Sequence, residues 1–217
     1  MNRFGLKFFR LCLFLIGFFF LMGCDRTDEV ELETGDLLFR GKTPSMLSRA
    51  IDDVTQTGDD NHFSHIGLVE VINGEVKVIH ADGLHGVCLQ PLDSFLLDGE
   101  GEPLYVEAFR LKSGFGDAVD VAIKRSRSVI GEPYNYSYII EDTGYYCSEL
   151  VWWAFKPDSV FALEPMTFKD QNTGTFHPGW IEHYEELSIE IPEGRPGCNP
   201  NGMAASENIY RLGVVNR

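Results

Sequence analysis

The stretch FSHIGLVEVINGEVKVIHAD spans residues 63–82 and holds two runs rich in β-forming residues, 63–72 and 75–81. Asn73-Gly74 separates the two runs. An Asn-Gly pair between apolar runs is the strongest short signal for a β-hairpin with a two-residue loop. We therefore expect two antiparallel strands joined by a tight turn.

The register of this hairpin predicts a cluster of ionisable side chains on one face. A two-residue loop pairs the residues that flank it, so His80 falls opposite Gly67, and Asp82 falls opposite His65. Opposed residues, and residues two apart on one strand, point to the same face of a sheet. His65 and His80 are then diagonal neighbours, roughly 7–8 Å apart at the backbone and within reach of each other's imidazoles. We expect Gly67 to leave open space beside them.

A second motif, YYCSELVWWAF at residues 145–155, places Cys147 at the start of an apolar helix that ends before Pro157. A helix N-terminus presents free N–H groups and the positive end of its dipole, which favour thiolate over thiol. The same N–H groups can stabilise an oxyanion. We expect Cys147 to be a reactive thiolate near neutral pH. The alternative is a buried structural cysteine, a common fate of this residue on helices.

The rest of the chain predicts a mixed fold. Further strands are expected at residues 35–39, 104–111 and 209–215, and a helix at 117–130 with Asp117 as N-cap and Gly131 as its stop signal. Residues 156–217 otherwise have the composition of loops. Antiparallel strands with segregated helices predict an α+β domain.

The N-terminus predicts a lipoprotein signal peptide over residues 1–23. Its cations are followed by an apolar run too short for a membrane helix, 11–22, which ends in the lipobox-like LMGC of residues 21–24. We expect cleavage before Cys24 and lipidation of its thiol, and multiple acyl chains would give stable membrane anchoring. An acidic linker, 24–33, then precedes the α+β domain.

That domain is expected to occupy residues 34–217 and to lie in the cell envelope, outside the cytoplasm, on either the inner or the outer membrane. The chain carries a net charge of −15, which argues against nucleic acid and anionic lipid head groups as partners. Its 44% hydrophobic residues are sufficient for a buried core.

The cysteine count predicts one disulfide. Cys12 would leave with the signal peptide and Cys24 would be lipidated, so Cys88, Cys147 and Cys198 remain. An oxidising compartment favours one bond and one free thiol. We expect Cys88 to pair with Cys198.

Five motifs occur in an order that resembles a known family: GDLLF at 35–39, SHIGLV at 64–69, VIHA at 78–81, GEPYN at 131–135 and YCSELV at 146–151. Together they resemble the circularly permuted NlpC/P60 group of papain-like proteins, specifically the YaeF/YiiX-type lipoproteins. The resemblance covers residues 34–155. It implies a papain-like core in which the histidine strand precedes the cysteine helix.

The resemblance also implies roles for individual residues. Cys147 would be the nucleophile, His65 its general base, and a polar residue at position 80 would orient the histidine. In relatives that third residue is often glutamate; here it is His80. Asp82 is a possible substitute.

These observations predict a cysteine amidase that needs no cofactor, acts on a cell-wall peptide or related amide, and uses Tyr134 and Tyr146 to contact the substrate, with Tyr136 as a further pocket wall. Three alternatives stay open: a metal site built from His62, His65 and His80; a lipid hydrolase or acyltransferase, since related permuted enzymes act on lipids; and a non-catalytic peptide-binding lipoprotein.

Overall fold

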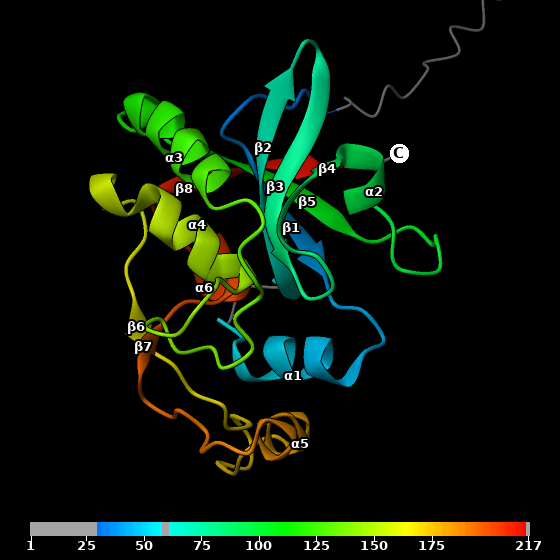
Figure 1. The fold of residues 1–217 in the computed structure, drawn as a ribbon, viewed down its shortest axis with the longest axis vertical. Coiled ribbons are helices and arrows are strands. Elements are labelled where there is room, and N and C mark those ends of the chain that lie inside the picture. Colours follow the sequence, from blue (N-terminus) through cyan, green and yellow to red (C-terminus); the bar gives the residue numbers. More distant parts are fainter. Residues whose placement is uncertain (1–29, 58–60, 216–217) are drawn as a thin grey trace, which may run out of the picture.

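A six-stranded antiparallel sheet, ordered β4-β3-β2-β1-β5-β8, forms the centre of the molecule (Figure 1). The computed structural model describes residues 30–57 and 61–215, so the predicted signal peptide and Cys24 lie outside the described residues. The strands of this sheet are β1 (Leu37–Gly41), β2 (Phe63–Ile72), β3 (Glu75–Asp82), β4 (Gly86–Pro91), β5 (Val106–Leu111) and β8 (Ile209–Val214).

Helices pack against the sheet, and two further helices lie beyond one end of it. They are α1 (Met46–Val54), α2 (Leu92–Phe95), α3 (Gly116–Ser128), α4 (Cys147–Phe155), the 3₁₀ turn η1 (Lys156–Asp158), α5 (Pro178–Leu187) and α6 (Pro200–Ala204); a small ribbon pairs β6 (Glu164–Pro165) with β7 (Pro196–Gly197). Helix α4 packs against β2, β3 and α3, whereas α5 packs on α1 at the far end (Figure 1). Antiparallel strands with helices packed around them confirm the α+β prediction.

The hairpin has the predicted register. Leu68 pairs with Ile79, and Ile72 pairs with Glu75 across the turn. Asn73 and Gly74 both have positive φ, 54° and 83°, as the favoured two-residue hairpin loop requires. The turn chemistry therefore sets which face each hairpin residue points to.

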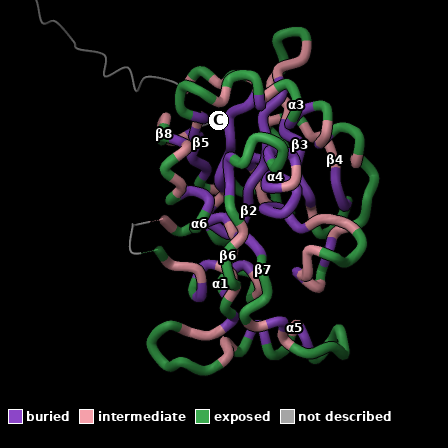
Figure 2. The backbone as a smooth tube through the Cα atoms, turned by 90° about the vertical axis from the view of Figure 1, so that its left-hand side faces the viewer, coloured by how far each residue is buried: buried purple, intermediate pink, exposed green. Residues whose placement is uncertain are grey.

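Alternation along the strands divides the core into two layers. Leu37, Phe39 and Ile66 belong to the larger cluster, which also contains α4. Leu38 and Val69 point the other way, into a smaller cluster with Phe95 of α2. Buried residues are accordingly concentrated in the central strands, whereas the residues around α5 are largely exposed (Figure 2).

Two sequence predictions about helices are wrong. Helix α3 begins at Gly116 with Phe115 at its N-cap, so Asp117 lies inside the first turn instead of capping it. Residues 156–217 are not only loops, because they hold α5, α6 and the β6–β7 ribbon. Tertiary contacts stabilise these short elements; in α5, for example, the Trp180 Nε1–H donates to the Ala50 carbonyl of α1 at 3.2 Å.

Within residues 30–57 and 61–215, no helix is long and apolar enough to cross a membrane.

Candidate active site

His65 of β2 and His80 of β3 are in direct contact. The His65 Nε2 lies 2.8 Å from the His80 Nδ1, and the two rings are perpendicular with their centroids 5.0 Å apart. His80 is completely buried and His65 nearly so. In a neutral imidazole one nitrogen donates and the other accepts, so this bond couples the tautomers of the two rings. It leaves the Nδ1 of His65 available for another partner.

The space beside the histidines is filled by an aromatic ring. The Phe95 ring of α2 lies 5.7 Å from the His65 ring and 5.1 Å from the His80 ring, between centroids. A Cβ at Gly67 would lie 2.4 Å from Val78 Cγ1 and 3.1 Å from Phe95 Cε2. The expectation of open space at Gly67 is therefore wrong. The missing side chain instead allows Phe95 to pack against both imidazoles.

On its other side His80 faces Cys88. These residues are paired across β3 and β4, and the His80 Nε2 lies 3.6 Å from the Cys88 Sγ. Burial, reinforced by the nearby Arg40 charge, lowers the pKa of His80 to about 4 and also holds the pKa of His65 well below its usual value. Both rings are consequently neutral at neutral pH.

Asp82 is occupied elsewhere. Its Oδ1 accepts the backbone N–H groups of Leu84 and His85 and contacts the His85 Nδ1 at 2.8 Å. It makes no hydrogen bond to either His65 or His80 among the described residues. The structure thus favours His80 over Asp82 as the residue that orients His65.

Cys147 is the first residue of α4, and Tyr146 is the N-cap. Glu149, three residues after the cap, is buried, and its Oε2 accepts the Tyr146 N–H and the Asn135 Nδ2–H, each at 3.1 Å. Glu149 thereby satisfies the N–H of the N-cap residue and ties the 135–146 loop to α4. Burial raises the pKa of the Glu149 carboxyl to about 8.

The Cys147 thiol is buried against β2. The backbone N–H groups of Ile66, Cys147 and Ser148 lie at its sulfur, and together with Arg40 they lower its pKa, but burial outweighs them and raises the pKa above the usual thiol value. The expectation of a resting thiolate is therefore wrong. No hydrogen bond joins the Cys147 sulfur to the His65 ring in the described structure; the Ile66 N–H, one residue after His65, brings the thiol to this strand.

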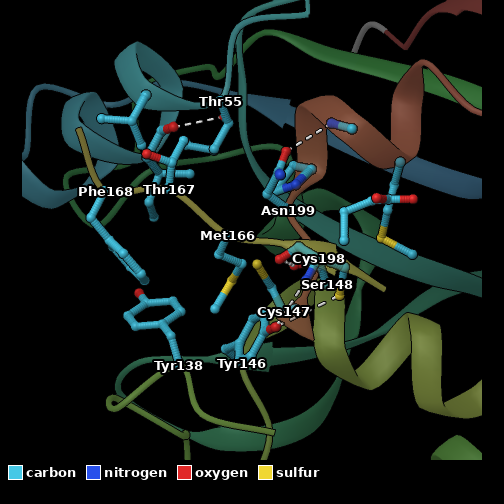
Figure 3. A pocket seen from close by; sticks show the side chains of 18 of the residues that line it. Thr55, Tyr138, Tyr146, Cys147, Ser148, Met166, Thr167, Phe168, Cys198 and Asn199 are labelled. Carbon is cyan, nitrogen blue, oxygen red and sulfur yellow. Dashed lines mark hydrogen bonds between the residues drawn. The ribbon is translucent and has the colours of Figure 1, made fainter. Parts of the chain in front are cut away.

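A cavity of about 290 Å³ opens beside Cys147. Its wall is mainly apolar and includes Ile51, Val54, Phe161, Met166, Phe168 and Trp180. Tyr138, Tyr146 and Cys198 also face it (Figure 3). Much of this wall comes from residues 161–168 and 197–206, the region that sequence patterns left without structure. An apolar group of a substrate could be held here next to the thiol.

Comparison with known proteins identifies the family. Residues 31–213 match the model of the permuted papain-like amidase enzymes, the YaeF/YiiX, C92 family. The chain belongs to this family. It is therefore a member of a papain-like cysteine peptidase and amidase family, as the five motifs predicted.

Two relatives agree with this result. The uncharacterized protein YiiX of Escherichia coli strain K12 is 30% identical over 121 residues, and the match covers 55% of this chain and 55% of that relative. The crystal structure of the metalloprotein yiiX from Escherichia coli O157:H7 superposes with a TM-score of 0.65 at 23% identity, over 85% of this chain and 97% of that one. The second likeness shows the shared fold.

In this C92-family chain, the two tyrosines predicted to contact substrate differ in position. Tyr146 lines the cavity, but its hydroxyl accepts the Cys198 N–H at 3.2 Å and so also supports the wall. Tyr134 is not among the lining residues; its ring packs on Tyr136 at 4.9 Å between centroids, and its hydroxyl lies 3.4 Å from that of Tyr138. Tyr138, which the sequence motifs did not indicate, lines the cavity where Tyr134 was expected to do so.

The predicted disulfide is wrong. Cys88, Cys147 and Cys198 are all free thiols. Cys88 lies against His80 on β4, whereas Cys198 lies beside Tyr146, with its Sγ 3.7 Å from the tyrosine hydroxyl. The two predicted partners therefore contact different parts of the site.

The three histidines considered as metal ligands do not converge. The His62 Nδ1 lies 3.0 Å from the Asp52 carboxylate, away from the His65–His80 pair, whose facing nitrogens are used in their own bond. Within the described ranges no group of three His, Cys, Asp or Glu side chains is arranged to hold a metal ion.

Proposed function

We propose that the protein is an envelope lipoprotein that hydrolyses amides, with Cys147 as nucleophile, His65 as general base and His80 as the residue that orients the base. The observation that carries this proposal is the 2.8 Å contact between His65 Nε2 and His80 Nδ1. It gives the base a fixed angle and leaves its Nδ1 free, on the strand whose Ile66 N–H lies at the Cys147 sulfur. A nucleophile, a base and an orienting group are the three parts that thiol hydrolases require.

The proton positions follow from the hydrogen bonds. If His65 Nδ1 is to accept the Cys147 proton, His65 must carry its own proton on Nε2 and donate it to His80 Nδ1. Neutral His80 then carries its proton on Nε2, which faces the Cys88 sulfur. The half-buried thiol of Cys88 is a suitable weak acceptor, because desolvation raises its pKa to about 11 and keeps it protonated.

The reaction starts from an uncharged pair, since the pKa of Cys147 is raised and that of His65 is lowered. His65 Nδ1 removes the thiol proton as sulfur attacks the substrate carbonyl. Backbone N–H groups at the start of α4 stabilise the oxyanion. The imidazolium then protonates the leaving amine, and a water activated by His65 hydrolyses the thioester.

The cavity beside Cys147 supports a substrate that carries an apolar group. Its wall includes large apolar side chains such as Phe161, Phe168 and Trp180. The same apolar lining favours a second candidate, a thiol-dependent lipid hydrolase or acyltransferase, whose acyl chain would occupy the cavity. A cell-wall peptide amide and a lipid ester place the same kind of carbonyl at the sulfur, and they differ in the leaving group.

Matched substrates test this proposal. Pairs of fluorogenic amides and esters with the same apolar acyl group should be hydrolysed by the wild type, and Cys147→Ala and His65→Ala should abolish turnover of the amides. A higher kcat/KM for the amide than its chemical reactivity predicts would support the amidase, and preference for the ester alone would support the lipid enzyme. Amide turnover that persists in Cys147→Ala would refute both.

We further propose membrane anchoring through Cys24, supported by the LMGC sequence of residues 21–24 and the apolar run before it. Mass spectrometry of the mature N-terminal peptide should show a diacylglyceryl adduct on Cys24. An unmodified Cys24 in a soluble form would contradict the anchor without affecting the catalytic proposal.

A further inference from the structure

Arg40 is placed at the histidine pair by strand register. On β1 it lies opposite His65 of β2 and opposite Val106 of β5. Directly opposed residues of antiparallel strands point to the same face. Arg40 therefore projects from the face that carries His65, and no sequence motif assigned it a role.

An aromatic ring holds the guanidinium group next to both imidazoles. The Arg40 Cζ lies over the Phe95 ring, 5.0 Å from its centroid. Phe95 is the residue that packs on His65 and His80. A guanidinium stacked on an aromatic face keeps its N–H edge directed outward, so it is pre-organised for a planar acceptor.

That N–H edge lacks a partner. Arg40 is only partly exposed, and its Nε is buried without a hydrogen-bond acceptor among the described residues. Arg110, Arg127 and Arg211 each bind a carboxylate, at Asp36, Glu70 and Glu107 respectively. The chain contains 33 acidic residues and 18 basic ones, so a half-buried arginine without an ion pair in the described part is unexpected.

We propose that Arg40 binds a carboxylate of the substrate, close to the carbonyl that Cys147 attacks, and so determines specificity. The inference rests on the proposed function in taking Cys147 as the reacting group. A carboxylate matches the planar N–H fork of arginine with two parallel hydrogen bonds, and the terminal nitrogens of Arg40, unlike its Nε, are not buried. The substrate class is then an amide that carries a carboxylate near the scissile bond and an apolar group for the cavity.

The electrostatics of the site agree with this geometry. Burial is the main cause of the shifted pKa values of Cys147, His65 and His80, and the positive charge of Arg40 opposes the rise at the thiol and adds to the fall at both histidines, so its field reaches all three groups. Asp82 is the described carboxylate that raises the pKa of Arg40, but it forms no ion pair with it and is bonded within its own turn. An anion at Arg40 would therefore replace a missing partner without displacing one.

Alkylation of Cys147 tests the proposal without requiring turnover. Iodoacetate and iodoacetamide transfer nearly identical groups to sulfur with loss of iodide, but only the first carries a carboxylate. 3-Bromopropionate and its amide form a second pair with a longer reach. Rates at Cys147 are measured by peptide mass spectrometry, and the acid-to-amide rate ratio cancels any change in the reactivity of the thiol itself.

In the folded wild type, at least one acid-to-amide ratio should exceed that of Cys147 in the denatured chain by about tenfold, the effect of one charge-assisted hydrogen bond. Arg40→Gln should bring this ratio down to the denatured value, whereas Arg40→Lys should give an intermediate ratio. Arg49→Gln, at an exposed arginine of α1, is the matched control for overall charge and should leave the ratio unchanged.

Equal ratios in the folded and denatured wild type, or in wild type and Arg40→Gln, would overturn the proposal. If Arg40→Gln does not fold, competition in the wild type decides: succinate should protect Cys147 from iodoacetamide better than succinamide does, and equal protection would overturn the assignment. The alkylation rates at Cys147 can be measured even if the protein hydrolyses no amide. Failure of the proposed function is therefore distinguished from failure of the carboxylate site at Arg40.

Discussion

The His65 Nε2 and the His80 Nδ1 are 2.8 Å apart, so that the two imidazoles of one β-hairpin share a single hydrogen bond. In the mechanism that we propose, the neutral second histidine orients the first by accepting its N–H, which is the task that a carboxylate performs in other thiol and serine hydrolases. The difference is that His80 adds no negative charge. In this proposed role His80 would orient the base without raising its pKa, which agrees with the lowered pKa of His65.

Substitution of His80 should slow amide hydrolysis without abolishing it. His80→Ala removes the acceptor for His65 Nε2–H, so we expect kcat/KM to fall by about 10²- to 10⁴-fold, the range for loss of an orienting group. His80→Glu should retain much of the rate because a carboxylate accepts the same N–H. Steady-state kinetics of folded variants measure both effects.

Asp82→Ala is the matched control for that series, because Asp82 bonds to Leu84 and His85 and not to the histidine pair. It should change kcat/KM far less than His80→Ala does. If kcat/KM fell strongly in Asp82→Ala and stayed near wild type in His80→Ala, the orienting role would belong to Asp82 instead.

The stability of the fold should depend on pH through His80. Its pKa is about 4 in the folded chain and near 6.5 when unfolded, so the unfolded chain binds more protons between these values. The free energy of unfolding should therefore fall as pH drops from 6.5 to 4, by roughly 3 kcal/mol from this group. Urea unfolding at several pH values should show this decrease in the wild type and a smaller decrease in His80→Gln. An identical slope in the two proteins would contradict the assignment.

Glu149 should stabilise the start of α4 mainly as a hydrogen-bond acceptor. Glu149→Ala would leave the Tyr146 N–H and the Asn135 amide without their acceptor, at a cost of roughly 2–4 kcal/mol of unfolding free energy. Glu149→Gln keeps an acceptor and should cost much less.

The same residue gives an opposite pH dependence. Because the pKa of Glu149 is raised to about 8 in the folded chain, the stability due to its protonation is lost as pH rises from 4.5 to 8. Thermal melting should show Glu149→Gln gaining stability relative to wild type over this window. A constant difference would mean that the carboxyl is ionised in the fold.

Narrowing the cavity should select against large apolar groups. Ala162 lines the cavity and is itself exposed, so Ala162→Trp can fill space with little disturbance of the core. We expect kcat/KM to fall about tenfold or more for substrates with long acyl chains and to stay near wild type for acetyl substrates. Equal effects on both would place the apolar group outside this cavity.

The hairpin half of the site was predictable because its geometry is local. Asn73-Gly74 fixes the register, and the register alone places His65 and His80 on one face. The start of α4 at Cys147 was also visible, since its motif and apolar run are contiguous. In each case a few neighbouring residues determine the outcome.

Features that depend on distant segments were not predictable. Arg40 reaches His65 through the pairing of β1 with β2, which no turn signal specifies. The pKa of Cys147 depends on burial by other segments, which overrides the helix start. Cavity residues such as Phe168 and Trp180 belong to short elements that are stabilised by tertiary contacts and not by propensity.

The most direct test of the catalytic centre is mass spectrometry of the enzyme quenched during amide turnover. The account predicts an acyl group on Cys147 that hydroxylamine removes, absent from Cys147→Ala and from His65→Ala. Turnover that continues in Cys147→Ala, or an acyl group found instead on Cys88, Ser148 or Cys198, would contradict it.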